Sequence, residues 1–335
     1  MKYLRVPQND TSPNDLAGYT TLREGAAIVD RQERSLLRLA GKDPVGMLNA
    51  VLTNDMPAQD NRGAYALLLN QKGRVQTDLR VVKTVNGVLV DTEPEGAEAA
   101  KEILGRYAPF SRVKLEELPD WNVLGLYGPR AAGLVKNLGL AEHETEQAEI
   151  GGVPVLVVGV AVPVGGYDFI GPSDALGKIR EHLVERGAVA ADRDVYETAR
   201  ITAGVPRFGA DITPENFPGE SENVLERAVS FGKGCYPGQE TVARMHYRGS
   251  PNKKLYRFEL EAGLMYTPRT GDEVMQSEKE LVGSISPVGV VGRLTSVTPF
   301  PVDSRIYALG YLARKANLEA PMTAESAKVL SVTQA

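Results

Sequence analysis

The sequence predicts an α+β protein, with ferredoxin-like subunits around a small barrel, followed by a separate all-β barrel domain. Two observations lead to this prediction. Over the first 250 residues, β-rich runs alternate with helical segments and β-meanders, as in α+β domains. Beyond that point, short β runs are separated by Gly, Pro and Ser. We therefore expect one domain at 1–250, a barrel at 251–320 and a loose tail at 321–335.

The composition is that of an ordinary globular protein. Of the 335 residues, 42% are hydrophobic and 24% are charged, and the net charge is −5. This charge argues against a protein dedicated to nucleic-acid binding. Residues 1–10 lack the apolar core of a signal peptide, and no run approaches the ~20 apolar residues that span a bilayer. We therefore expect a cytoplasmic protein without membrane association.

Cysteine and histidine are scarce in this chain. Cys235 is the single cysteine, which excludes an intrachain disulfide and a four-thiolate cluster. The three histidines, at 143, 182 and 246, show no metal-ligand spacing. We therefore predict no metal site.

Turn and cap signals divide the first 190 residues into elements. Asp43 followed by Pro44 is typical of a helix start. Residues 71–73 form a turn signal between two β runs and predict a hairpin. Strands are predicted at 35–41, 64–70, 74–82, 87–91, 123–127, 153–158 and 164–170, and a short apolar run stands at 26–30. Helices are predicted at 43–51, 98–106, 130–139 and 174–186.

Alternation along the second hairpin strand separates two faces. The odd-numbered residues from 75 to 81 share one face, and Gln76, Asp78 and Arg80 share the other. An acid beside two polar neighbours belongs either to a solvated sheet face or to a functional site. The alternation itself does not decide between the two.

The segment 195–204 is predicted to be a helix that ends at Gly204. Glu197 and Arg200 lie three residues apart on one face of that helix, where they can pair. If exposed, such a pair would contribute less than ~1 kcal/mol to stability. The alternative is a pair that belongs to a binding site.

Residues 231–249 are the least ordinary part of the chain. They contain Cys235, His246, Pro237 and four glycines among many polar side chains. Because glycine and proline favour special backbone shapes, we expect a tight loop here rather than a packed helix. The loop is either a turn with an idle cysteine or a functional site. The polar side chains exceed what a turn requires.

A basic run overlaps this segment. Between Arg227 and Arg257 there are seven Lys or Arg residues and one acid, Glu240. The run predicts either a solvated basic face or an electropositive mouth for an anionic ligand.

The octapeptide K-G-C-Y-P-G-Q-E at 233–240 resembles the K-G-C-Y-x-G-Q-E signature of the YgfZ-type folate-binding proteins. These are relatives of the glycine-cleavage T-protein, an aminomethyltransferase. Residues 197–206 are similar to the family segment E-x-x-R-[IL]-x-x-G-x-P, and the resemblance covers nearly the whole chain. It implies a T-protein-like folate-binding domain with a C-terminal barrel. It also implies tetrahydrofolate as cofactor, polyglutamylated forms included, and an accessory role in iron–sulfur cluster assembly or repair and in tRNA modification.

The resemblance also implies roles for individual residues. Asp78 falls where the T-protein has an aspartate that faces the reactive nitrogen of tetrahydrofolate. Glu197 matches a glutamate that binds the pterin, since a carboxylate can accept two parallel N–H bonds. Cys235 would lie at the cavity mouth as a reactive thiolate favoured by nearby cations. We therefore predict Cys235 and Asp78 as catalytic residues, and as folate-binding residues Glu197, Arg200, Lys233, Tyr236, Gln239, Glu240 and Arg244.

Two other functions remain open. An aminomethyltransferase of the T-protein type is favoured by Asp78 and opposed by Gln239, where the matching T-protein segment has arginine. A hydrolase could use Cys235 with His246, but no orienting third group stands at a recognisable spacing. A role in cluster chemistry with one cysteine requires further thiols from outside the chain. The expected partners are therefore iron–sulfur enzymes or cluster-assembly proteins.

Overall fold

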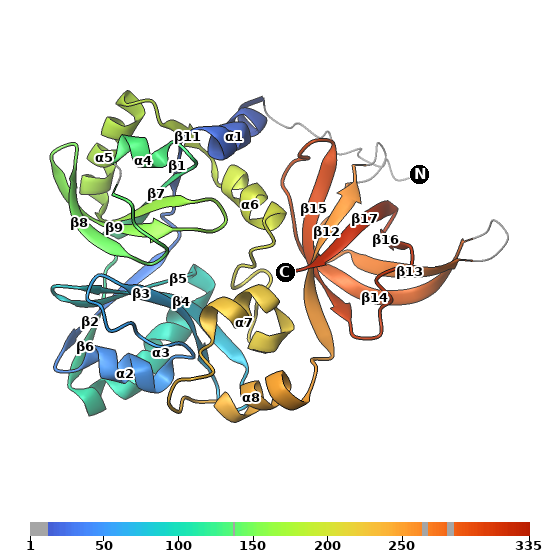
Figure 1. The fold of residues 1–335 in the computed structure, drawn as a ribbon, viewed down its shortest axis with the longest axis horizontal. Coiled ribbons are helices and arrows are strands. Elements are labelled where there is room, and N and C mark those ends of the chain that lie inside the picture. The colour runs from blue at the N-terminus through green and yellow to red at the C-terminus, as the bar shows by residue number, and fades with distance from the viewer. Residues whose placement is uncertain (1–12, 137, 263–266, 280–284) are drawn as a thin grey trace, which may run out of the picture.

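The computed structural model describes residues 13–136, 138–262, 267–279 and 285–335. They form two open sheets with helices against them and a closed barrel beside them (Figure 1). The predicted α+β architecture with a second, all-β barrel domain is confirmed.

The first sheet has five strands and is covered on one face by two helices. Asp43 caps the first of these helices as predicted, because its carboxylate accepts a hydrogen bond from the Gly46 amide at 2.8 Å. The strands, in sheet order, are β3 (Gly63–Leu69), β4 (Val75–Thr84), β5 (Gly87–Thr92), β2 (Ser35–Gly41) and β6 (Val113–Glu117). The helices are α2 (Pro44–Val51) and α3 (Ala97–Tyr107). The second of them, α3, leads into the 3-10 turn η2 (Ala108–Ser111).

The second sheet has six strands with helices on both faces. The strands, in sheet order, are β11 (Val189–Ala191), β1 (Ala27–Asp30), β7 (Trp121–Tyr127), β10 (Gly166–Pro172), β9 (Val153–Val160) and β8 (Thr145–Ile150). One face packs on α4 (Ala131–Leu134) and α5 (Ser173–Glu185), and the other on α1 (Pro13–Glu24) and α6 (Arg193–Thr202). Three of these elements, α1, β8 and β11, are not predicted by the sequence pattern. In β8 only Thr145 and Ile150 are buried, which leaves no clear alternation.

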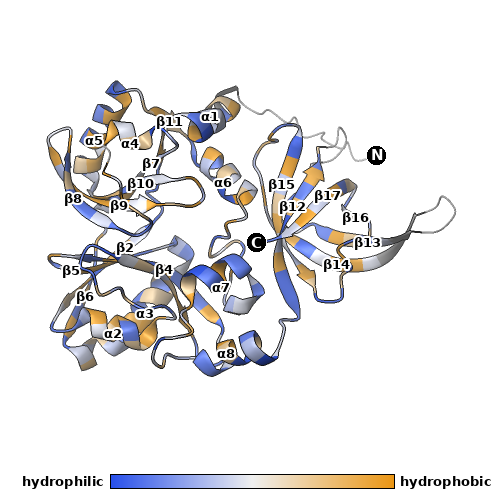
Figure 2. Ribbon diagram, viewed as in Figure 1, coloured by the Kyte–Doolittle hydropathy of each residue, from blue (hydrophilic) through white to orange (hydrophobic). Residues whose placement is uncertain are grey.

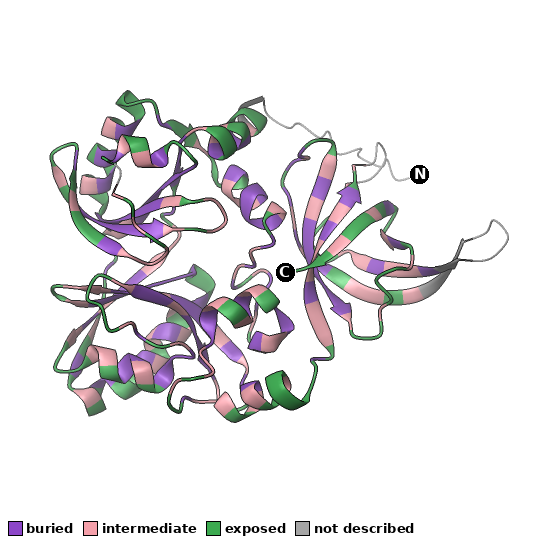
Figure 3. Ribbon diagram, viewed as in Figure 1, coloured by how far each residue is buried: buried purple, intermediate pink, exposed green. Residues whose placement is uncertain are grey.

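The inner faces of the two sheets meet through an apolar cluster. Leu36, Val82 and Leu89 of the first sheet pack against residues of the second, among them Val158 and Ile170. In Figure 3, buried residues follow the strands of both sheets, and in Figure 2 the helices outside them carry mixed hydrophobic and hydrophilic faces. Beside this apolar contact, the facing surfaces are lined by charged residues.

The barrel closes with the last strand of the chain. Its strands, in order, are β12 (Lys253–Glu261), β15 (Arg305–Ala313), β14 (Ile285–Val297), β13 (Glu273–Lys279), β16 (Met322–Ala324) and β17 (Ala327–Gln334). The prediction of a loose tail at 321–335 is therefore wrong. Strand β17 pairs with β12 and β16, and this pairing removes the open edges that a shorter barrel would leave. One of the short β runs that predict the barrel, at 281–286, lies partly outside the described residues.

The segment 231–249 is only partly a loop. Residues 231–238 are irregular, but α8 (Gln239–Arg248) is a helix, contrary to the prediction. Its residues are mostly good helix formers, while Val242 is its one buried residue, so no apolar periodicity marks it. Between α6 and α8 lie the 3-10 turn η3 (Pro218–Glu220) and α7 (Glu222–Ala228). Among the described helices, none combines the length and apolar content needed to cross a bilayer.

Candidate functional site

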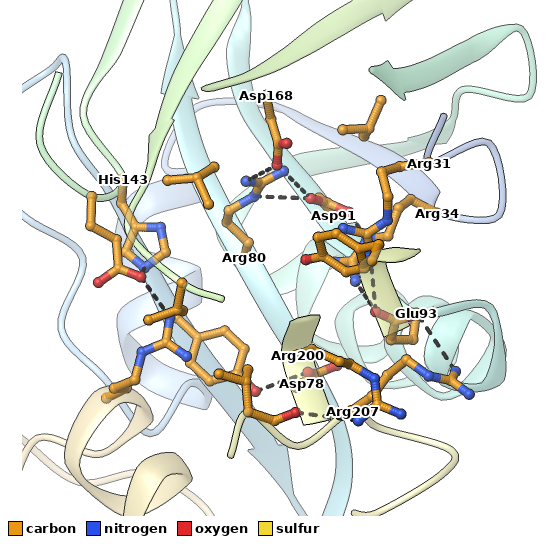
Figure 4. Close-up of a pocket in the computed structure, with 18 of the residues that line it drawn as sticks. Arg31, Arg34, Asp78, Arg80, Asp91, Glu93, His143, Asp168, Arg200 and Arg207 are labelled. Carbon is orange, nitrogen blue, oxygen red and sulfur yellow. Dashed lines mark hydrogen bonds and ion pairs between the residues drawn. The ribbon is translucent and has the colours of Figure 1, made fainter. Parts of the chain in front are cut away.

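A pocket lies between the two sheets, next to α6 and the segment 205–207 (Figure 4). Its free volume is about 120 Å³. Charged side chains dominate its walls. The arginines are Arg31, Arg34, Arg80, Arg200, Arg207 and Arg227, and the carboxylates are Asp78, Asp91, Glu93, Glu142 and Asp168.

Asp91 is held between two of these arginines. Arg34 Nε donates to Asp91 Oδ1 at 2.6 Å, and Arg80 Nε donates to Asp91 Oδ2 at 2.9 Å. Burial acts to raise the pKa of Asp91, but Arg34 and Arg80 together hold it below its ordinary value. Arg80 also donates from Nη1 to Asp168 Oδ2 at 2.5 Å. Since Asp168 belongs to β10, Arg80 joins the two sheets by charge.

Asp78 lines the pocket from the same face of β4 as Arg80, as the alternation predicts. Its Oδ2 accepts a hydrogen bond from the Tyr65 hydroxyl at 2.9 Å, and its Oδ1 has no hydrogen-bond partner. Burial raises the pKa of Asp78 to about 6, against the opposing charge of Arg34. The carboxyl group therefore takes up a proton just below neutral pH, and it does not belong to a solvated sheet face.

His143 and Glu142 reach the pocket from the loop before β8. The backbone of His143 is in the left-handed region, with φ 62°, and is held by the Gly159 carbonyl and the Gly63 amide, at 2.9 and 2.7 Å. Burial lowers the pKa of its imidazole to about 4, so the ring is neutral at pH 7. Glu142 Oε1 accepts a hydrogen bond from Arg227 Nη2 at 2.6 Å. No metal-ligand spacing in the sequence marks His143.

Four buried polar atoms of residues that line this pocket lack a hydrogen-bond partner. They are Asp78 Oδ1, Glu93 Oε2, His143 Nδ1 and Arg207 Nε. Most buried polar groups in native proteins are paired, so each exception calls for an explanation. Their convergence on one pocket indicates a site whose polar contacts are completed by a bound molecule or by water.

The predicted pair on α6 is part of this site. Arg200 lines the pocket and donates from Nε and Nη2 to Glu197 Oε2 at 2.9 and 2.7 Å. Arg200 is 3% exposed, so the interpretation as an exposed ion pair is wrong. It also donates to Asp211 Oδ2 at 2.8 Å and to Ser296 Oγ of β14 at 3.0 Å. Arg200 therefore links the pocket to the barrel. Glu197 is not among the lining residues.

The predicted ligands from the 233–240 octapeptide and α8 do not line the pocket. Lys233 Nζ donates to the carbonyls of Asn49, Leu52 and Asn54, where α2 ends. Cations at such carbonyls stabilise a helix end, which gives Lys233 a structural role. Of the others, Tyr236 is buried in an apolar cluster, Gln239 is half-buried, and Cys235, Glu240 and Arg244 are exposed.

Glycines fix the octapeptide against the β3–β4 hairpin. Gly238 precedes α8 with φ 80°, and Gly73 of the hairpin turn also has φ 80°. A Cβ at Gly238 would lie 2.5 Å from the Asn70 carbonyl oxygen and 2.7 Å from Gly73 Cα. Only glycine combines this backbone shape with so close an approach. The octapeptide thus contacts the turn that leads into β4, the strand of Asp78.

The basic run at 227–257 is not a single electropositive mouth. Only Arg227 of this run lines the pocket, whereas Lys233 binds the end of α2. Arg257 donates to the Thr202 carbonyl at 2.8 Å, and Lys253 lies 3.8 Å from Glu220. The other pocket arginines come from elsewhere in the chain. Of these, Arg200 belongs to the family segment at 197–206, and no sequence motif marks Arg31, Arg34, Arg80 or Arg207. Among the described residues, no group of His, Cys, Asp or Glu is arranged to hold a metal ion.

Comparison with known proteins matches this fold and its sequence. The family described as GCVT N-terminal domain matches residues 4–233. A tRNA-modifying protein YgfZ of Photobacterium profundum is 28% identical over 257 residues, which cover 75% of this chain and 74% of that protein. Another of that name, from Yersinia pestis, is 27% identical over 234 residues, covering 68% and 69%.

A solved structure has the same fold over most of the chain. The glycine cleavage system aminomethyltransferase T of Bartonella henselae superposes with a TM-score of 0.72 over 94% of this chain and 86% of that one, at 19% identity. This likeness confirms the T-protein-like fold. The family match over residues 4–233, together with the YgfZ relatives, shows that the chain belongs to the GCVT N-terminal domain family, as a YgfZ-type protein of the T-protein-like superfamily.

Proposed function

We propose that the pocket binds tetrahydrofolate, and that the protein supports assembly or repair of iron–sulfur clusters in other enzymes. The observation that carries the folate part is the set of four buried atoms around one pocket that lack a hydrogen-bond partner. Three of them belong to Asp78, Glu93 and His143 and can accept hydrogen bonds, and Arg207 Nε donates. A pterin ring carries both N–H donors and acceptor atoms, so it can complete such a set.

Two carboxylates are candidates for the 2-amino-4-oxo edge of the pterin. The resemblance assigns this role to Glu197, but its Oε2 already accepts both hydrogen bonds from Arg200. Glu93 is 4% exposed, and its Oε2 lies 3.7 Å from Arg207 Nη1 but has no hydrogen-bond partner. It can therefore accept a hydrogen bond from a ligand without losing an existing one. We therefore add Glu93 to the proposed ligands, with Glu197 and Arg200 holding the adjacent wall.

Asp78 is the residue proposed to handle a proton. Bound tetrahydrofolate supplies a one-carbon carrier whose nitrogens gain and lose protons. With a pKa of about 6, Asp78 can hold a proton at Oδ1 or accept a hydrogen bond there, while Tyr65 fixes Oδ2. This observation also favours the second candidate function, an aminomethyltransferase of the T-protein type. The glutamine at 239, where the T-protein segment has arginine, still opposes it.

Cys235 is proposed to act at the surface rather than in the pocket. Its thiol is exposed and does not line the cavity, so contact with a cluster would take place on a partner protein that supplies further thiols. The tRNA-modifying name of the relatives supports a link to enzymes of tRNA modification. We propose that the protein carries out this role in the cytoplasm.

Calorimetric titration of tetrahydrofolate tests the binding proposal. We expect wild type to bind, and Asp78→Asn and Glu93→Gln each to weaken binding by about tenfold or more, since hydrogen bonds to charged groups contribute ~1.5–3 kcal/mol. Glu197→Gln tests the other candidate for the 2-amino-4-oxo edge: a larger loss of binding in this variant than in Glu93→Gln would assign the edge to Glu197. Cys235→Ala is the control and should bind like wild type. Absence of binding to wild type would overturn the folate proposal.

The role of the thiol needs a cellular readout. In cells that lack this protein, wild type should restore the activity of iron–sulfur enzymes. Cys235→Ala should fail to restore it while its purified form still binds tetrahydrofolate. Full restoration by Cys235→Ala would contradict the proposed surface role of the cysteine.

A further inference from the structure

Helix α8 presents one face to solvent at the edge of the molecule (Figure 1). Arg244, Tyr247 and Arg248 stand at positions i, i+3 and i+4, so they share one side of the helix. All three are exposed, and Tyr247 is 68% exposed. Val242, on the opposite side, is the buried residue that holds α8 to the body. We call the side formed by Arg244, Tyr247 and Arg248 the outer face of α8.

Aromatic rings continue this face toward the octapeptide. The ring of His246 stacks on that of Phe231 with centroids 4.0 Å apart, and it meets the Tyr247 ring edge-on at 4.7 Å. Phe231 and Tyr247 are themselves 5.8 Å apart. Tyr247 therefore offers an exposed ring on which a planar group can stack. The rings of Phe231, His246 and Tyr247 therefore pack against one another, and Tyr247 is mostly exposed to solvent.

The two arginines of the outer face are free to bind an anion. Within the described part of the chain, neither Arg244 nor Arg248 makes a hydrogen bond or ion pair, whereas Arg227, Lys233 and Arg257 are engaged. The one acid of the helix, Glu240, lies a turn before Arg244. The local charge is therefore positive on a chain of net charge −5.

We propose that the outer face of α8 binds single-stranded RNA, with Tyr247 stacking on a base while Arg244 and Arg248 contact phosphates. Unpaired RNA bases are recognised by stacking on aromatic and arginine side chains, which this face offers together. Duplex DNA keeps its bases stacked inside and could use only the two arginines. An acidic protein segment would likewise use the arginines and leave the aromatic rings without a role. The net charge of −5 argues against a protein dedicated to nucleic-acid binding, and a small local RNA-binding surface is compatible with that charge.

The test is fluorescence anisotropy with a labelled 12-nucleotide RNA of mixed sequence at low salt. We expect Tyr247→Ala to weaken binding about 5- to 100-fold with little change in its salt dependence. Arg244→Ala combined with Arg248→Ala should lower the slope of log affinity against log salt by about 1.4, because each phosphate contact on a single strand contributes about 0.7. Lys178→Ala on α5 with Arg186→Ala at its C-cap removes the same charge from an exposed surface and should leave binding near the wild-type value.

Several outcomes would overturn the proposal. These are no binding by wild type at micromolar protein, equal losses in the α8 and α5 variants, or a duplex DNA that binds as tightly as the RNA. Displacement of the RNA by a polyglutamate peptide, with Tyr247→Ala unaffected, would instead assign the face to acidic protein segments. None of these readouts depends on folate, so the proposal stands or falls separately from the pocket.

Discussion

The pocket and the octapeptide at 233–240 differ in what holds them together: side-chain charges in the first and backbone contacts in the second. In the pocket, charged side chains from distant parts of the chain pair in a buried space, as Arg80 does with Asp91 and Asp168. In the octapeptide, the backbone makes the decisive contacts, since Gly238 approaches Gly73 and Lys233 binds carbonyls. The most specific motif of the sequence therefore does not line the pocket. It holds the hairpin that carries Asp78, so a sequence signature can mark the support of a site rather than its lining.

The largest effect should come from breaking the pocket network at Arg80. Arg80→Ala leaves Asp91 and Asp168 buried with fewer partners, and removal of one member of a buried ion pair costs about 3–5 kcal/mol. Urea unfolding measures this loss. Arg106→Ala is the control, because Arg106 pairs with Glu102 on an exposed helix face and should cost at most about 0.5 kcal/mol. A loss at Arg80 no larger than the control would mean that the sheets are not joined by charge.

The next effect concerns the pH dependence of stability through Asp78. Its pKa is about 6 in the folded protein against an ordinary 3.8, so the folded state binds more protons between these values. The stability contributed by the protonated group is fully present below about pH 4 and is lost as pH rises through 6. Asp78→Asn removes this dependence. The difference in free energy of unfolding, Asp78→Asn minus wild type, should therefore rise by roughly 2–3 kcal/mol between pH 4 and 7. A constant difference across that range would show that Asp78 is not desolvated.

The smallest effect concerns the backbone contact between the octapeptide and the β3–β4 hairpin. Gly238→Ala places a Cβ 2.5 Å from the Asn70 carbonyl oxygen on a backbone with φ 80°, and should cost about 2 kcal/mol in the free energy of unfolding. Gly234→Ala, four residues earlier, meets no atom within 4 Å and should change stability by less than about 0.5 kcal/mol. Thermal unfolding of both variants compares them directly. Equal effects would contradict a backbone contact as the reason for the glycine.

Local signals predicted the elements with strong patterns and missed those without them. The cap at Asp43, the turn at 71–73 and the alternation through β4 correctly gave α2, the hairpin and the common face of Asp78 and Arg80. Helix α8 was missed because Val242 is its one buried residue, and β17 because β12, the strand with which it closes the barrel, lies far away in the sequence. The prediction of a loose tail failed for this second reason, since a strand that closes a barrel is recognisable only by its neighbours.

The sequence by itself determined the family, the α+β architecture and the position of Asp78 on one strand face, because motifs and periodicity are local properties of the chain. Only the tertiary structure decided which residues surround Asp78. Glu93, His143 and Arg207 come from three separate segments, and no spacing in the sequence relates them. The tertiary structure also decided that Lys233 binds the carbonyls at the end of α2 and that Arg244 faces solvent. The physical reason is that burial and charge pairing, which set the chemistry of a pocket, depend on distances in space rather than along the chain.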